Sequence, residues 1–216
     1  MKVAIVGATG FIGSKLLTEA VSRGHIVTAI TRSPDKLPKD AAHMIPVPAD
    51  VNDVHALTRY FHGQDAVIHA YAPGRGLSAE ENMAKQRAGT LSIIAATKAA
   101  AVKRLLAVGG AGSLEVRPGV AHFDTPEFPA AYQGGARATA QIKDLLRAEK
   151  DLDWTFLCPS TMIVPGERTG KFRLGGDQLL IGEDGQSRIS VEDYAVAMID
   201  ELENPKHTKH RFTVGY

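Results

Sequence analysis

Met-Lys-Val-Ala-Ile-Val-Gly-Ala-Thr-Gly-Phe-Ile-Gly, residues 1–13, is the stretch that decides the fold. A short apolar run, Val3–Val6, leads into three glycines with the spacing Gly-x-x-Gly-x-x-Gly, namely Gly7, Gly10 and Gly13. An amphipathic helical pattern begins within this triad. A strand, a tight turn and a helix start in this order aim free backbone N–H groups and the positive end of a helix dipole at one point, which suits a pyrophosphate. The stretch predicts a dinucleotide-binding corner; the alternative is a glycine-rich turn that holds no ligand.

Each glycine of the triad has its own predicted task. Gly7 permits the turn, Gly10 lets the backbone approach the phosphates, and Gly13 lets the helix lie close to the strand.

Composition narrows the class of protein. The 216 residues suit one substantial α/β domain, and 25 Lys plus Arg nearly balance 24 Asp plus Glu, which argues against a nucleic-acid or anionic-membrane partner. Cys158 is the single cysteine, so an internal disulfide and a cysteine-rich metal site are excluded, and the eight histidines show no metal-ligand spacing. No apolar run approaches the roughly 20 residues of a membrane span, and the early first strand leaves no room for a signal peptide. We therefore expect a cytoplasmic protein without a metal site.

Strand and helix patterns alternate along the chain. Expected strands are Val3–Val6, Ile26–Thr31, Met44–Val47, Ala66–Ala70, Arg104–Val108, Trp154–Cys158, Lys171–Leu174, Leu179–Ile181 and Arg211–Val214. Expected helices are Phe11–Arg23, Val54–His62, 78–101, Ala130–Glu149 and Val191–Leu202, the fourth irregular at Gly134-Gly135. This order predicts an α/β fold with a doubly wound (Rossmann) parallel sheet and a small C-terminal cap. We expect residues 1–216 to form a single domain in which about 159–190 make a substrate-side lobe.

The end of the second strand indicates which nucleotide is bound. An Asp or Glu at this point accepts hydrogen bonds from the ribose 2′-hydroxyl of NAD and repels a 2′-phosphate, but here the residue is Arg32. A guanidinium can bind a phosphate through two hydrogen bonds and stack on adenine. NADP(H) is therefore preferred, NAD(H) remains an alternative, and the other interpretation of Arg32 is a solvated surface arginine.

The proton-donor pair of carbonyl reductases is missing. Their Tyr-x-x-x-Lys motif supplies a proton to the developing alkoxide. Here the position four residues after Tyr132 is Ala136 and not lysine, and the position four residues before Lys143 is Thr139 and not tyrosine. A flavin or a quinone needs little enzymic acid, because the anion left by hydride addition is delocalised. The sequence therefore favours a small planar, conjugated acceptor, with flavin as a substrate and not a tightly bound prosthetic group.

Five stretches carry a family resemblance: residues 6–13, Val108–Leu114, Asp153–Ser160, Pro165–Arg173 and Ser190–Ala195. Together they resemble the atypical short-chain dehydrogenases/reductases, and within these the bacterial NAD(P)-binding proteins provisionally named NADH-flavin reductases. These are relatives of biliverdin-IXβ/flavin reductase and of the NmrA-like regulators. The resemblance covers essentially the whole chain.

The resemblance implies roles for individual residues. The pyrophosphate would be held by Gly7, Thr9, Gly10, Phe11 and Ile12. Arg32 would hold the 2′-phosphate, Asp50 and Val51 would flank adenine, and Ala70 and Tyr71 would lie along the ribose. The nicotinamide would be approached by Gly109, Gly110 and Ser113, with Pro159, Ser160 and Thr161 beside its carboxamide. Asp50 could alternatively cap the helix that follows it.

Two residues are candidates for contact with the acceptor. Ser113 would place a hydroxyl beside it, and Tyr132 would belong to an aromatic wall; the alternatives are a turn serine and a residue of the cap core. The leading hypothesis is thus an NAD(P)H-dependent flavin or quinone reductase. A non-enzymatic NADP(H)-binding redox sensor and a nucleotide-sugar epimerase or dehydratase are alternatives. Helices 78–101 and 130–149 are candidates for pairing in a homodimer.

Overall fold

The computed structural model describes residues 1–39, 41–74 and 76–216. Its centre is an eight-stranded sheet with the order β10-β12-β8-β5-β4-β1-β2-β3. The pairing is parallel throughout, except that β10 runs antiparallel to β12 at the edge. The strands of this sheet are β1 (Lys2–Val6), β2 (Ile26–Thr31), β3 (Met44–Pro48), β4 (Ala66–His69), β5 (Arg104–Val108), β8 (Asp153–Pro159), β10 (Arg173–Gly175) and β12 (His210–Gly215).

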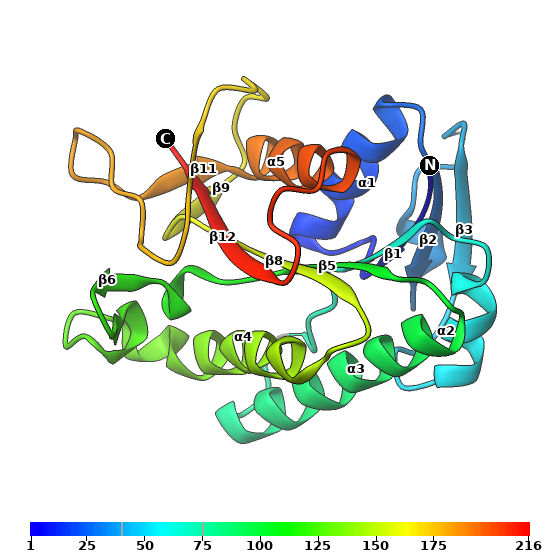
Figure 1. Cartoon of the computed structure of the whole chain (residues 1–216), viewed down its shortest axis with the longest axis horizontal. Helices are drawn as coiled ribbons and strands as arrows, with labels where there is room; N and C mark the ends of the chain where they lie inside the picture. The colour runs from blue at the N-terminus through cyan, green and yellow to red at the C-terminus, as the bar shows by residue number, and fades with distance from the viewer. Residues whose placement is uncertain (40, 75) are drawn as a thin grey trace.

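Five α-helices cover the two faces of the sheet (Figure 1). They are α1 (Phe11–Ser22), α2 (Val54–Phe61), α3 (Ala79–Ala99), α4 (Ala130–Ala148) and α5 (Val191–Glu203). Helices α1 and α5 lie together on one face, and α2, α3 and α4 form the other layer. Two hydrophobic clusters fill the spaces between the layers. The predicted doubly wound (Rossmann) α/β fold is confirmed.

The strand interiors explain why the sheet is buried on both faces. Val3, Ala4 and Ile5 of β1 are fully buried, and Val3 and Ile5 pack in one cluster while Ala4 packs in the other. This near-continuous apolar run is typical of a parallel strand with helices above and below it.

Helix starts follow local capping chemistry. Ser78 and Glu81 form a capping box at the start of α3, and Ser190 accepts a hydrogen bond from the N–H of Asp193 at the start of α5. Asp53 caps α2 through the N–H of Ala56. Asp50 does not cap this helix.

The expectations for the C-terminal third need correction. The strand expected at Leu179–Ile181 is wrong: this stretch is irregular, and only an isolated bridge joins Gln178 to Glu115. The strand expected at Lys171–Leu174 begins later than predicted: the observed strand, β10, runs from Arg173 to Gly175. Helix α4 runs unbroken through Gly134-Gly135. Further short elements are β6 (Glu115–Arg117), β7 (Val120–Ala121), β9 (Met162–Val164), β11 (Arg188–Ser190) and the 3-10 turns η1 (Pro34–Lys36), η2 (Ala111–Ser113) and η3 (His122–Asp124).

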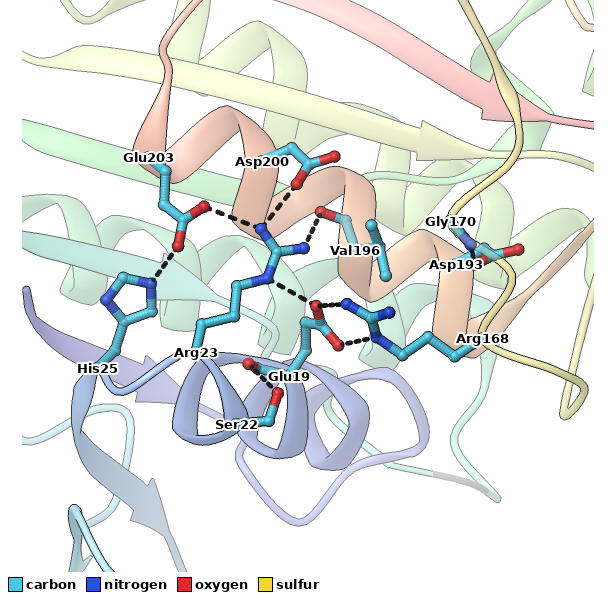
Figure 2. A network of polar contacts seen from close by, with 10 residues as sticks. All are labelled: Glu19, Ser22, Arg23, His25, Arg168, Gly170, Asp193, Val196, Asp200 and Glu203. Atoms are coloured by element: carbon cyan, nitrogen blue, oxygen red, sulfur yellow. Dashed lines mark hydrogen bonds and ion pairs between the residues drawn. The ribbon is translucent and has the colours of Figure 1, made fainter.

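A network of charges fastens the loop after β9 to the helices α1 and α5 (Figure 2). The carboxylate of Glu19, on α1, accepts two hydrogen bonds of 2.7 Å from Arg168 and a third of 2.7 Å from Arg23. Arg23 also binds Asp200 and Glu203 of α5, at 2.7 and 2.8 Å. The hydrogen bonds from Arg168 hold the pKa of Glu19 below its usual value. The network joins three segments that are far apart in the chain.

A second fastening lies at the start of α5. Asp193 is fully buried and accepts hydrogen bonds from the hydroxyl of Thr169, the N–H of Gly170 and the hydroxyl of Tyr216. Residues 168–170 are thus held both to α1 and to α5. The role of about 159–190 as a substrate-side lobe, and the single domain, stay predictions.

Within the ranges that the structure describes, the search for a helix long and apolar enough to cross a bilayer finds none.

Candidate functional site

The β1–α1 corner is built from close backbone contacts that only glycine allows. Gly7 has a φ of +88°, and a Cβ on it would lie 2.6 Å from the carbonyl oxygen of Ala70, at the end of β4. A Cβ on Gly13 would lie 2.1 Å from the carbonyl oxygen of Gly7. Both positions therefore require glycine, and Gly13 brings α1 against the end of β1.

The first turn of α1 faces an open space. Gly10 is its N-cap residue and makes no side-chain capping hydrogen bond, while its own N–H donates to the carbonyl of Gly7 at 2.9 Å. A Cβ on Gly10 would approach that carbonyl to 3.2 Å. A helix start without a side-chain cap offers its N–H groups to an anion. The geometry suits the pyrophosphate predicted here.

A cavity of about 850 Å³ opens from this corner. It lies at the carboxyl ends of β1, β2, β4 and β5, where the strand order reverses between β1 and β4; doubly wound sheets bind their ligands at this point. The volume is near the upper end of small-molecule sites, roughly 300–1,000 Å³. The structure brings eleven of the predicted cofactor residues to its walls: Gly7, Thr9, Gly10, Phe11, Ile12, Arg32, Asp50, Val51, Ala70, Tyr71 and Gly109.

Arg32 and Asp50 stand at the β2 end of the cavity. No salt bridge of Arg32 is found within the described part of the chain, so its guanidinium is available to an anionic ligand. Asp50 accepts hydrogen bonds from the N–H and the side-chain amide of Asn52, at 2.8 and 3.0 Å. The hydroxyls of Thr9 and Thr31 are 2.8 Å apart and fasten the glycine loop to β2.

Seven predicted site residues lie outside the cavity wall: Gly13, Gly110, Ser113, Tyr132, Pro159, Ser160 and Thr161. Ser160 is buried and its hydroxyl donates to the carbonyl of Val214 at 3.0 Å. Thr161 is exposed, and its N–H donates to Ser187. Pro159 ends β8 opposite Val214 of β12. Their contact with a nicotinamide carboxamide stays a prediction.

The two candidates for contact with the acceptor have different surroundings. Ser113 is buried in the turn η2, where its hydroxyl donates to the carbonyl of Gly110 at 3.3 Å and lies 3.9 Å from the sulfur of Cys158. Tyr132 is 68% exposed at the start of α4. The position of Ser113 favours the alternative that it is a serine with a structural role in a turn. Tyr132 does not line the cavity.

One wall of the cavity was absent from the sequence interpretation. It is formed by two helices, with Ala84, Lys85, Gln86 and Ala88 from α3 and Thr139 and Ile142 from α4. The i, i+4 spacing of two small residues, Ala84 and Ala88, was the available signal. It indicates a helix face that approaches something closely, but it does not say what.

No acid is found among the described residues at the end of the cavity near Gly109. Its wall there is Val108, Gly109, Thr139 and Ile142, and the hydroxyl of Thr139 donates to the carbonyl of Gly135 at 3.0 Å. Lys143, one turn further along α4, is not on the wall, and burial, with Arg211 nearby, lowers its pKa.

Nucleophilic and metal chemistry find little support in the described residues. Cys158 is fully buried, and this burial raises the pKa of its thiol to about 11, so the thiol stays protonated at neutral pH. In the described ranges, no three His, Cys, Asp or Glu side chains gather so that they could hold a metal ion.

Comparisons with known proteins agree with this geometry. A family described as NAD(P)H-binding matches residues 7–204. The protein YwnB of Bacillus subtilis, which has no assigned function, is 39% identical over 219 residues, covering 99% of this chain and 98% of its own. A structure from Bacteroides thetaiotaomicron, provisionally named an epimerase, is 43% identical with a TM-score of 0.91 and covers 100% of this chain and 96% of its own. A Streptococcus pneumoniae structure, provisionally named an NADH-flavin reductase, is 35% identical with a TM-score of 0.83. The match covers 100% of this chain and 99% of that structure's chain.

Proposed function

The chain belongs to the NAD(P)H-binding family, and from this we propose that it is an NADPH-dependent oxidoreductase that reduces a flavin-like or quinone-like acceptor. The observation that carries the proposal is the composition of the cavity. Its β2 end offers a cation beside the glycine corner, and its β5 end offers a wall without an acid.

The residues present fit a nicotinamide dinucleotide. The uncapped start of α1 and the bare Cα of Gly10 leave room for two linked phosphates. Arg32 would hold a 2′-phosphate, while Asp50 and Val51 would flank the adenine. When bound, the reduced cofactor supplies a hydride.

The wall at Gly109 determines what kind of acceptor can be reduced. Val108 and Ile142 are apolar, and the hydroxyl of Thr139 is a very weak acid whose proton is already donated to a carbonyl. Such a wall can orient a flat ring and exclude water, but it cannot protonate an alkoxide. An acceptor that delocalises the added charge over a conjugated ring system meets this limit.

The test is an assay of NADPH oxidation in the presence of FMN, riboflavin and a set of quinones. The loss of nicotinamide absorbance measures the rate. We expect turnover above the control without protein for at least one conjugated acceptor, and none for simple ketones. Tight binding of NADPH with no turnover across the whole set would reject the reductase.

A redox sensor is the second candidate, because the missing acid also fits a protein that binds NADP(H) without chemistry. A sensor must bind NADP⁺ and NADPH with different affinities, since a ligand shifts an equilibrium only through differential binding. Equal affinities by calorimetry would remove this candidate.

Epimerase chemistry is supported by the names of structural relatives, among them the Bacteroides thetaiotaomicron structure. It needs an acid or base beside the nicotinamide, and the cavity wall near Gly109 has none among the described residues. A test with nucleotide sugars belongs in the same assay set.

A further inference from the structure

Tyr71 is a large residue at a crowded point of the cavity wall, directly after β4. Its N–H donates to Nδ1 of His69 at 3.3 Å, and its carbonyl accepts a hydrogen bond from the side chain of Gln86 at 3.3 Å. Nε2 of His69 lies 3.0 Å from the hydroxyl of Thr90 on α3. Burial lowers the pKa of His69 to about 4, so the ring is neutral near pH 7 and can accept at Nδ1 while donating at Nε2. The backbone of Tyr71 is therefore held from two sides.

The ring of Tyr71 rests on Gly89 of α3. A Cβ on Gly89 would lie 2.4 Å from Cε1 and 2.9 Å from Cδ1 of the ring. A glycine in the interior of a helix is unfavourable unless packing requires it. Gly89 has neither a turn nor a positive φ to explain it, so the contact with Tyr71 is its reason.

The remaining surface of Tyr71 belongs to the cavity. The side chain is half-buried, and it lines the same space as Arg32 and Asp50. The charges of both residues act on its hydroxyl, although burial is the larger influence and raises its pKa. The ring thus lines the cavity within reach of the charges at its β2 end, where the adenosine half of a dinucleotide would lie.

We propose that the Tyr71 ring, supported by Gly89, is the platform on which the adenine of the cofactor stacks, and that this pair sets the affinity for the adenosine half. The inference rests on the dinucleotide site of the proposed function. It replaces the contact with the ribose that the family resemblance implies. An aromatic face accepts any purine ring by stacking, whereas a small side chain such as alanine cannot.

The experiment measures binding of the two halves of the cofactor separately by calorimetry, with 2′,5′-ADP and reduced nicotinamide mononucleotide as probes. We expect Tyr71→Ala to weaken 2′,5′-ADP by roughly tenfold, the size of a lost base–aromatic stack, and to leave the mononucleotide unchanged. Tyr71→Phe keeps the ring and is expected to bind 2′,5′-ADP as the wild type does. Tyr71→Leu keeps an apolar body without a flat ring, and it serves if the alanine variant does not fold.

Gly89→Ala tests the support of the ring. Its methyl group displaces Tyr71, so it should weaken 2′,5′-ADP as Tyr71→Ala does, and the double variant should bind no more weakly than either single one. Gly135→Ala, on a helix position with nothing within 4 Å, is the matched control and should bind both probes normally.

The two proposals fail differently. Loss of both probes in equal measure, or normal binding of 2′,5′-ADP by Tyr71→Ala and Tyr71→Leu, would overturn the adenine platform. If the wild type binds neither probe, the proposed dinucleotide site itself is wrong, and the platform fails with it.

Discussion

Gly13→Ala tests the packing that creates the phosphate corner. Its Cβ would start 2.1 Å from the carbonyl oxygen of Gly7, and real Cβ atoms essentially never come closer than 3.0 Å, so α1 must move by about 0.9 Å. The obstacle is backbone and cannot rotate away, and Leu16 and Leu17 on the same helix lie in the core. Overpacking costs about 1–3 kcal/mol. Because this obstacle is rigid backbone, we take the upper end of that range, about 3 kcal/mol. The better helix propensity of alanine offsets about 1 kcal/mol, which leaves a net loss of about 2 kcal/mol.

The assay is thermal unfolding followed by circular dichroism. For a chain of this size, about 2 kcal/mol corresponds to a Tm lower by about 4–8 °C. The control is Gly135→Ala on α4, where the added methyl meets nothing within 4 Å. This change should raise stability by about 0.5–1 kcal/mol through helix propensity alone. A Gly13→Ala variant as stable as the wild type would refute the account of the corner.

Three further predictions concern the cofactor, acid stability and the acceptor. Arg32→Asp should weaken NADPH by about 1–3 kcal/mol relative to NADH in calorimetric titrations, through lost charge-assisted hydrogen bonds, and an unchanged preference would show that Arg32 does not contact the 2′-phosphate. Hydrogen bonds from Arg168 lower the pKa of Glu19; burial acts to raise that of Glu201, but hydrogen bonds from His207 and its neighbours lower it on balance. Both carboxylates thus stabilise the fold above their ordinary pKa of 4.5, and this stability is lost as the pH falls through the depressed folded values. Urea unfolding at falling pH should show the loss, and Glu19→Gln should reduce its pH dependence; an unaltered dependence would exclude the network as its source. Ser113→Ala should leave NADPH oxidation close to the wild-type rate, and a loss of roughly 10²-fold would instead make Ser113 a proton donor.

Local chemistry made much of the fold predictable. The glycine triad, the apolar strand runs and the alternation of strand and helix patterns specify a doubly wound sheet, because each is a property of neighbouring residues. That the β1–α1 corner and Arg32 line one cavity was predictable for the same reason, because the residues that follow neighbouring parallel strands meet at one edge of the sheet.

The sequence interpretation fails where packing between residues far apart in the chain determines the local structure. Residues Leu179–Ile181 have strand propensity, but the N–H of Leu179 bonds to the carbonyl of Glu115 beside an isolated bridge, and the pairing does not extend into a strand. The cavity wall from α3 depends on how that helix crosses the sheet, which no local pattern reports. The turn η2 directs the hydroxyl of Ser113 to the carbonyl of Gly110, and its contact with the acceptor stays a prediction.

The position of β12 has a consequence for synthesis on the ribosome. This strand is formed by residues 210–215, yet it lies inside the sheet between β8 and β10, and β10 has no other strand partner in the described structure. While the nascent chain still lacks these residues, β8 is an open edge and β10 cannot attach. Residues 210–215 must therefore be synthesised before the sheet can close, and a chain that stops short of residue 210 would expose an aggregation-prone edge at β8.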